Sequence, residues 1–110
     1  MRLLLNNFSC SSCDSNCHCK FTCSVSSSQY LIQLYHLHTT YDDQSNVEAK
    51  SYSVCLYEFE NNRIGREIDS VEVVSLDGSI EFDFASVRLD SCDVNQHCNC
   101  GNQVQIDPLL

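Results

Sequence analysis

The chain has 110 residues, of which 43% are hydrophobic, so a single folded domain is expected rather than two domains or a disordered chain. Fifteen Asp and Glu residues against six Lys and Arg give a net charge of −9, which repels nucleic-acid phosphates and argues against direct binding to DNA or RNA. The same charge favours a protein partner with a basic peptide segment. No apolar run approaches the roughly 18 residues of a membrane-spanning helix, so no membrane span is expected.

The N-terminus begins like a signal peptide but does not continue as one. Three leucines follow Met1-Arg2, and Asn6-Asn7 then ends the apolar run, well short of the roughly 7–15 residues of a signal-peptide core. The sequence as it stands therefore predicts no secretory leader. Asn7-Phe8-Ser9 is nevertheless an N-glycosylation sequon, which is typical of a secreted protein whose leader has been removed.

The middle of the chain has the composition of β-strands. Residues 24–28, which are mostly serine, predict a short flexible connector. Residues 29–41 and 51–60 are rich in aromatic and aliphatic side chains and favour strands, although 29–41 also satisfies helical spacing. The polar residues 42–50 predict a loop between them, and Asn61-Asn62 with Gly65 indicates a turn after the second strand.

Two further strands are predicted over residues 70–76 and 79–89, separated by Asp77-Gly78. This dipeptide between two alternating runs predicts a β-hairpin, because both central positions of a type I′ turn need a positive φ. Ile80, Phe82 and Phe84 should then face the core, and Glu81 and Asp83 should face solvent.

The predicted fold class is therefore mainly β. We expect one small single-domain β-rich fold over residues 1–110, either a sheet or a sandwich, with a cysteine cluster in loops at each of its two ends. If the two clusters meet in space, they close the sheet.

Nine cysteines leave at least one outside any complete set of disulfides. Cys55, which lies between Val54 and Leu56 in a predicted strand, is the expected odd residue, because a free cysteine behaves as a small buried hydrophobe. The other eight would form two metal sites or four disulfides. They are Cys10, Cys13, Cys17, Cys19, Cys23, Cys92, Cys98 and Cys100.

The spacing of the first cluster favours zinc. Residues 13–23 contain the pattern C-x3-C-x-C-x3-C, and Cys17-x-Cys19 leaves too little chain to favour a bond between its own two members. Tetrahedral zinc accepts such close ligands, and thiolate-rich zinc sites are usually closed and support folding rather than catalysis. In the second cluster Cys92, Cys98 and Cys100 offer three more thiolates, and Cys10, His18 or His97 could complete a set.

Several motifs resemble those of SET-domain histone-lysine methyltransferases of the H3 lysine-9 type. CDSNCHCKFTC, residues 13–23, resembles the end of the pre-SET zinc cluster. Residues 30–39 and SYSVCLYE, residues 51–58, are similar to strands of the SET fold. SCDVN, residues 91–95, is similar to the Asn-His-Ser-Cys-x-Pro-Asn motif, and CNCG, residues 98–101, is similar to the post-SET C-x-C-G motif.

This resemblance implies one zinc cluster with Cys13, Cys17, Cys19 and Cys23, and a second zinc held by Cys92, Cys98 and Cys100. It also implies a location inside the cell, in the nucleus. The family's Gly-Trp-Gly-type cofactor motif is missing, so the chain would be a reduced relative, and protein-lysine methyl transfer is the activity expected only if the chain is an enzyme. No G-x-S-x-G or H-E-x-x-H motif occurs, and no catalytic residue is predicted.

A secreted domain is the alternative interpretation, since clustered cysteines in a small chain are typical of disulfide-linked secreted scaffolds. YSVCLYEF, residues 52–59, also resembles the Phe-x-Val-Cys-Leu-x-Glu-Tyr strand of the N-terminal domain of Notch ligands, an extracellular β-sandwich. The sequence thus favours an intracellular, non-catalytic zinc-binding module for protein interaction, and leaves open a secreted, disulfide-stapled β-sandwich recognition domain.

Overall fold

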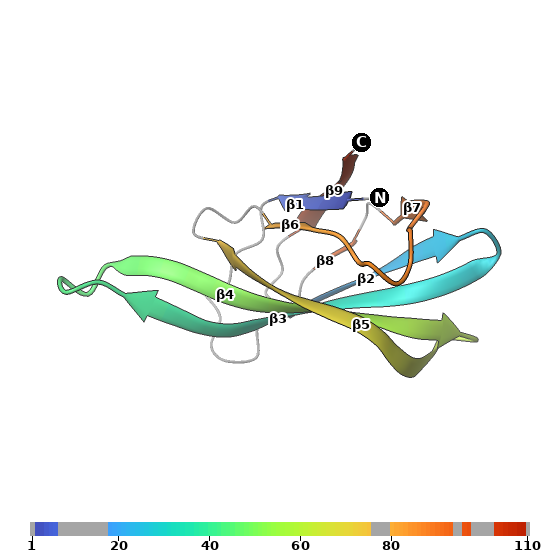
Figure 1. Cartoon of the computed structure of the whole chain (residues 1–110), viewed down its shortest axis with the longest axis horizontal. Coiled ribbons are helices and arrows are strands. Elements are labelled where there is room, and N and C mark those ends of the chain that lie inside the picture. Colours follow the sequence, from blue (N-terminus) through green and yellow to red (C-terminus); the bar gives the residue numbers. More distant parts are fainter. Residues whose placement is uncertain (1, 7–17, 76–79, 94–95, 98–102, 110) are drawn as a thin grey trace.

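The computed structural model describes residues 2–6, 18–75, 80–93, 96–97 and 103–109. All regular elements in these ranges are β-strands, so the mainly β fold class is confirmed (Figure 1). The strands are β1 (Arg2–Asn6), β2 (His18–Val25), β3 (Ser28–Tyr41), β4 (Val47–Glu60), β5 (Arg63–Ser75), β6 (Ile80–Phe82), β7 (Ser91–Cys92), β8 (Gln96–His97) and β9 (Gln103–Leu109). The described part of the chain contains no helix long and apolar enough to cross a bilayer.

The described strands form two antiparallel sheets. The larger sheet has the strand order β5-β4-β3-β2-β7, and the smaller one has the order β6-β1-β9-β8. Strands β3 and β4 have 14 residues each and β5 has 13, so the larger sheet runs along the 50 Å axis of the molecule. The smaller sheet lies over one face of the larger sheet, and both termini lie on that side (Figure 1).

Two-residue turns connect the long strands at one end of the larger sheet. Ser26-Ser27 joins β2 to β3, with Val25 opposite Ser28. Residues 24–28, predicted to be a flexible connector, therefore end one strand and begin the next. Asn61-Asn62 joins β4 to β5 with φ of 53° and 59°, which confirms the turn predicted there, although Gly65 lies within β5 and outside the turn. Asparagine tolerates this left-handed conformation better than most residues, because its short side chain can hydrogen-bond locally.

Asp42 organises the turn between β3 and β4. Its Oδ1 accepts hydrogen bonds from the backbone N–H groups of Gln44 and Asn46, both at 2.9 Å, and these bonds hold the pKa of Asp42 below its usual range. The predicted loop over residues 42–50 is shorter than expected, because this closed turn allows Tyr41 to pair with Val47. Strand β4 therefore begins three residues before the end of the predicted loop.

One hydrophobic cluster joins the two sheets. The larger sheet contributes alternate residues of three strands, as the two-residue period of a strand requires. The buried members of the cluster are Cys19, Phe21, Cys23, Ile32, Leu34, Tyr52, Val54, Leu56, Ile80, Phe82, Phe84 and Leu89. The orientation predicted for β6 and the residues after it is confirmed, since Ile80, Phe82 and Phe84 are buried whereas Glu81 and Asp83 are exposed.

The predicted hairpin around residues 77–78 is wrong in its strand pairing. These two residues lie outside the described part, but the strands on either side of them belong to different sheets: β5 pairs with β4, and β6 pairs with β1 through Leu5 and Ile80. A β6 strand placed beside β5 would extend the larger sheet and leave the core face of that sheet uncovered. Placing Ile80 and Phe82 in the opposite layer buries this face.

Candidate functional site

A disulfide bond joins the two cysteine-rich ends of the chain. Cys23 on β2 and Cys92 on β7 lie directly opposite each other in an antiparallel pair, with Cα atoms 4.0 Å apart and an S–S distance of 2.00 Å. The bond spans 69 positions of sequence. One cysteine of each cluster therefore meets its counterpart in space, and the bond attaches the short edge strand β7 to the larger sheet.

Hydrogen bonds on both sides of the disulfide hold the same two segments together. The backbone N–H of Asp93 donates to the carbonyl of Thr22 at 2.9 Å, and that of Asp90 donates to the carbonyl of Ser24 at 3.0 Å. The Asp90 carboxylate accepts a hydrogen bond from the backbone N–H of Ser26 at 3.0 Å, within the β2–β3 turn. The segment of residues 90–93 thus fixes both the strand β2 and the turn at its end.

The sequence predicted the first cysteine cluster in a loop, but Cys19 and Cys23 lie in the strand β2. Cys19 and Cys23 are 0% and 2% exposed and belong to the core cluster beside Phe21. Residues 19, 21 and 23 share one face of a strand, because their spacing of two matches the strand period. Of the other predicted ligands, Cys10, Cys13, Cys17, Cys98 and Cys100 lie outside the described residues, and His18 and His97 belong to β2 and β8.

Zinc binding stays a prediction. Within the part of the chain that the structure describes, no group of three or more His, Cys, Asp or Glu side chains is arranged to hold a metal ion, and five of the eight predicted ligands lie outside that part. Zinc binds the thiolate form of cysteine, so Cys23 and Cys92 cannot be ligands while they are bonded to each other.

Cys55 lies on the face of the larger sheet that points away from the core cluster, since its neighbours Val54 and Leu56 face the core. It is 7% exposed and outside any disulfide, which confirms it as a free buried cysteine. Its Sγ lies 3.5 Å from Ser53 Oγ, and burial raises the pKa of the thiol. A protonated thiol is a weak nucleophile, so this environment suits a packing role.

His36 and His38 lie at a β-bulge in β3, where His36 is half-buried and His38 is exposed. His36 Nε2 is 2.9 Å from Thr39 Oγ1, and its ring centroid is 5.6 Å from that of Tyr52. Burial, with Lys50 nearby, lowers the pKa of His36. His38 Nδ1 is 2.9 Å from Ser51 Oγ. Each imidazole therefore has a local hydrogen-bond partner within the β3–β4 hairpin.

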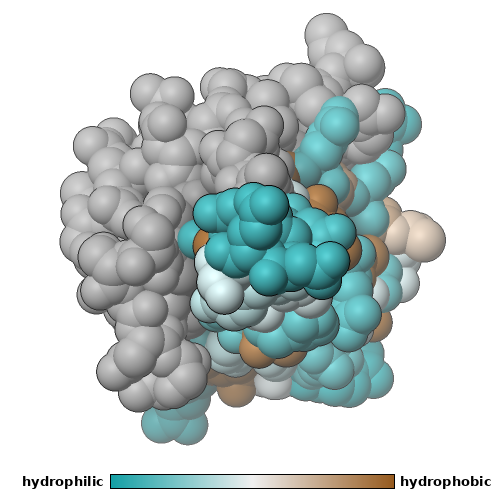
Figure 2. Space-filling view, turned by 90° about the vertical axis from the view of Figure 1, so that its left-hand side faces the viewer, coloured by the Kyte–Doolittle hydropathy of each residue, from teal (hydrophilic) through white to brown (hydrophobic). Residues whose placement is uncertain are grey.

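Among the described residues that Figure 2 colours, the exposed apolar side chains do not form one continuous patch at the end facing the viewer. The large ones are Leu37, Tyr41, Val47, Ile64 and Val74. The end that carries the β3–β4 turn is mostly hydrophilic in Figure 2, and the apolar areas visible there are separate from one another. Single exposed apolar side chains are normal on a soluble domain and indicate no site by themselves.

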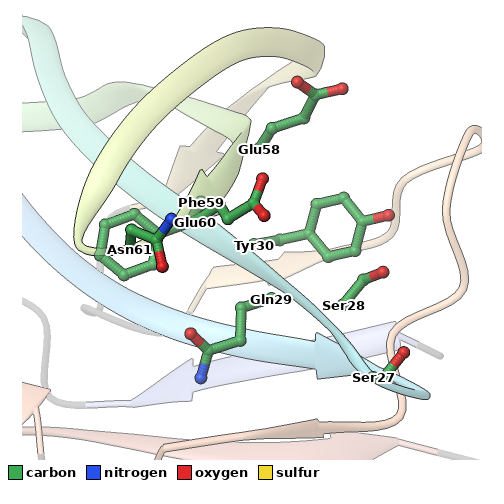
Figure 3. A pocket seen from close by; sticks show the side chains of 8 residues that line it. All are labelled: Ser27, Ser28, Gln29, Tyr30, Glu58, Phe59, Glu60 and Asn61. Atoms are coloured by element: carbon green, nitrogen blue, oxygen red, sulfur yellow. The ribbon is translucent and has the colours of Figure 1, made fainter.

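A hollow of about 570 Å³ lies at the opposite end of the larger sheet (Figure 3). Residues 27–30, at the start of β3, and residues 58–61, at the end of β4, line it. Tyr30 lies directly opposite Glu58 in the β3–β4 pairing. This hollow was not predicted from the sequence, because it depends on the register between two strands and on the turns that end them.

Comparisons of the chain with protein-family models, with curated proteins and with solved structures found no match. The resemblances to SET-domain methyltransferases and to the Notch-ligand domain therefore rest on the short motifs alone.

Proposed function

We propose that the chain is a non-catalytic protein-recognition domain of the secreted, disulfide-stapled β-sandwich kind. The observation that carries this proposal is the Cys23–Cys92 bond, which links positions 69 residues apart. Disulfides persist in oxidising compartments and are rare in the cytosol, where thiols are kept reduced. A chain of 110 residues has a modest core, and a covalent link between its two ends supplements that core.

The arrangement of the strands also supports a recognition role. Two tight turns and the hollow between them occupy one end of the larger sheet, and the inward-facing residues of β2, β3 and β4 belong to the core cluster. Rigid strands that present turns and adjacent side chains at one end are the usual way in which β-sandwich domains bind partners. Within the described ranges, the Cys55 thiol has a raised pKa, and His36 and His38 each have a local hydrogen-bond partner, so these three residues form no nucleophile–base pair.

The zinc-binding module predicted from the sequence would use the same sulfurs as thiolates. Intact-mass measurement distinguishes the zinc-binding module from the disulfide-stapled domain. Each disulfide removes two hydrogen atoms from the mass, and each bound zinc adds its own mass to the native ion. We expect protein produced through a secretory route, and supplied with zinc, to carry no zinc and to gain mass on reduction. Cys55→Ser should show the same gain on reduction as the unaltered chain, because Cys55 forms no disulfide.

A native mass that includes zinc, with no change on reduction, would overturn the proposal. It would favour the intracellular zinc module instead.

A further inference from the structure

We propose that the hollow formed by residues 27–30 and 58–61 binds a lysine or arginine side chain from a basic peptide segment of a protein partner. The inference rests on the proposed recognition function and names the partner's chemistry. Its starting point is the composition of the hollow, which contains the carboxylates of Glu58 and Glu60, the aromatic rings of Tyr30 and Phe59, and no basic residue.

The orientation of these side chains suits a cation. Glu58 and Glu60 are two positions apart on β4, so they project from the same face of the sheet. Figure 3 shows the Tyr30 ring on this face beside both carboxylates, with the Ser28 hydroxyl next to it. A cation placed against an aromatic ring and between carboxylates is attracted by the ring quadrupole and by both charges.

Neighbouring arginines leave room for this cation. Arg66 donates from Nη2 to Glu58 Oε1 at 3.2 Å, but both side chains are largely exposed and such a pair is weak. Arg63 is opposite Glu60 in the β4–β5 pairing and lines an adjoining hollow of about 280 Å³, which shares Glu58, Glu60 and Asn61 with this one. Because the ion pair of Arg66 is with Glu58, Glu60 is the carboxylate best placed to meet an incoming positive charge.

The partner's charge follows from that of the whole chain. A net charge of −9 steers a basic segment toward the surface and repels nucleic acids and other polyanions. The walls of the hollow are also held in place before binding. Asp90 fixes the β2–β3 turn through a hydrogen bond from Ser26, and Asn61-Asn62 closes the β4–β5 turn at the same end of the sheet. Little conformational entropy is therefore lost when the site is filled.

The test uses the full, oxidised chain and a hexa-arginine peptide, with binding followed by calorimetry or amide chemical shifts. We expect saturable binding that Glu60→Gln weakens about threefold, and that Tyr30→Leu, which removes the ring, weakens by about as much. The matched control is Glu72→Gln, which removes one exposed charge from β5 outside the hollow and should change the affinity by less than about 1.5-fold.

Equal weakening by Glu60→Gln and Glu72→Gln would overturn the inference, because it would show attraction to the overall charge only. An absence of saturable binding would overturn it as well. Intact mass recorded on the same sample distinguishes a failure of the cation site from a failure of the proposed function. A zinc-free, disulfide-bonded chain that does not bind hexa-arginine would refute the cation site in the hollow and leave the proposed function standing. Tyr30 packs partly against the core cluster, so Glu60→Gln decides the outcome if Tyr30→Leu fails to fold.

Discussion

Replacement of Phe82 by alanine is expected to lower the free energy of unfolding by about 3–5 kcal/mol. Phe82 lies on β6 in the smaller sheet, is 5% exposed, and contacts the ring of Phe84 edge-on at 5.5 Å between centroids. Its truncation would leave a cavity between the two layers, whose surroundings can close only in part. Urea unfolding followed by circular dichroism measures the change.

Arg88→Ala provides the control, because Arg88 is exposed and lies in the segment that follows Phe84. Its effect should stay within about 0.5 kcal/mol. A loss below about 1 kcal/mol for Phe82→Ala would show that β6 does not pack on the larger sheet.

Removal of the Cys23–Cys92 bond is expected to have a similarly large effect. The double substitution Cys23→Ala with Cys92→Ala should lower the free energy of unfolding by about 4 kcal/mol, because the open chain gains entropy in the unfolded state when a loop of this length is released. Chemical unfolding of the two proteins without reductant measures the difference.

Cys55→Ser is the matched control, since it removes a buried sulfur that is in no disulfide. It should cost about 1 kcal/mol, as expected for one altered packing contact. Equal losses in the two proteins would show that the contribution of Cys23 and Cys92 is packing and not a covalent link.

The long strands were predictable because their composition is consistent over many residues. Residues 29–41 and 51–60 are rich in aromatic and aliphatic side chains, and the structure places β3 and β4 there, with β4 beginning four residues earlier than predicted. The turn at Asn61-Asn62 was also predictable, since few residues tolerate two consecutive positive φ values. Such signals are local, and local signals determine individual strands and turns.

Pairing between distant segments could not be predicted in the same way. Asp77-Gly78 is a strong turn signal, but a turn does not specify which layer the next strand joins. Strand β6 joins the smaller sheet because Ile80 and Phe82 there cover the core face of the larger sheet. In the first cysteine cluster, Cys19, Phe21 and Cys23 have the two-residue period of a strand, but the same cysteines also have the close spacing of metal ligands, so the sequence supports both interpretations. The hollow at Tyr30 and Glu58 depends on strand register, which no short motif encodes.

The bond between Cys23 and Cys92 attaches the edge strand β7 to β2 in the larger sheet, and a proteolytic digest made under acidic conditions without reductant tests it most directly. Cleavage after Lys and Arg and before Asp isolates Cys23 in residues 21–41 and Cys92 in residues 90–92, with no other cysteine in either fragment. Mass spectrometry should find these two fragments joined, and should find them separate after reduction. Recovery of both fragments as unlinked thiols, or joined to other cysteine-containing fragments, would contradict the disulfide between β2 and β7.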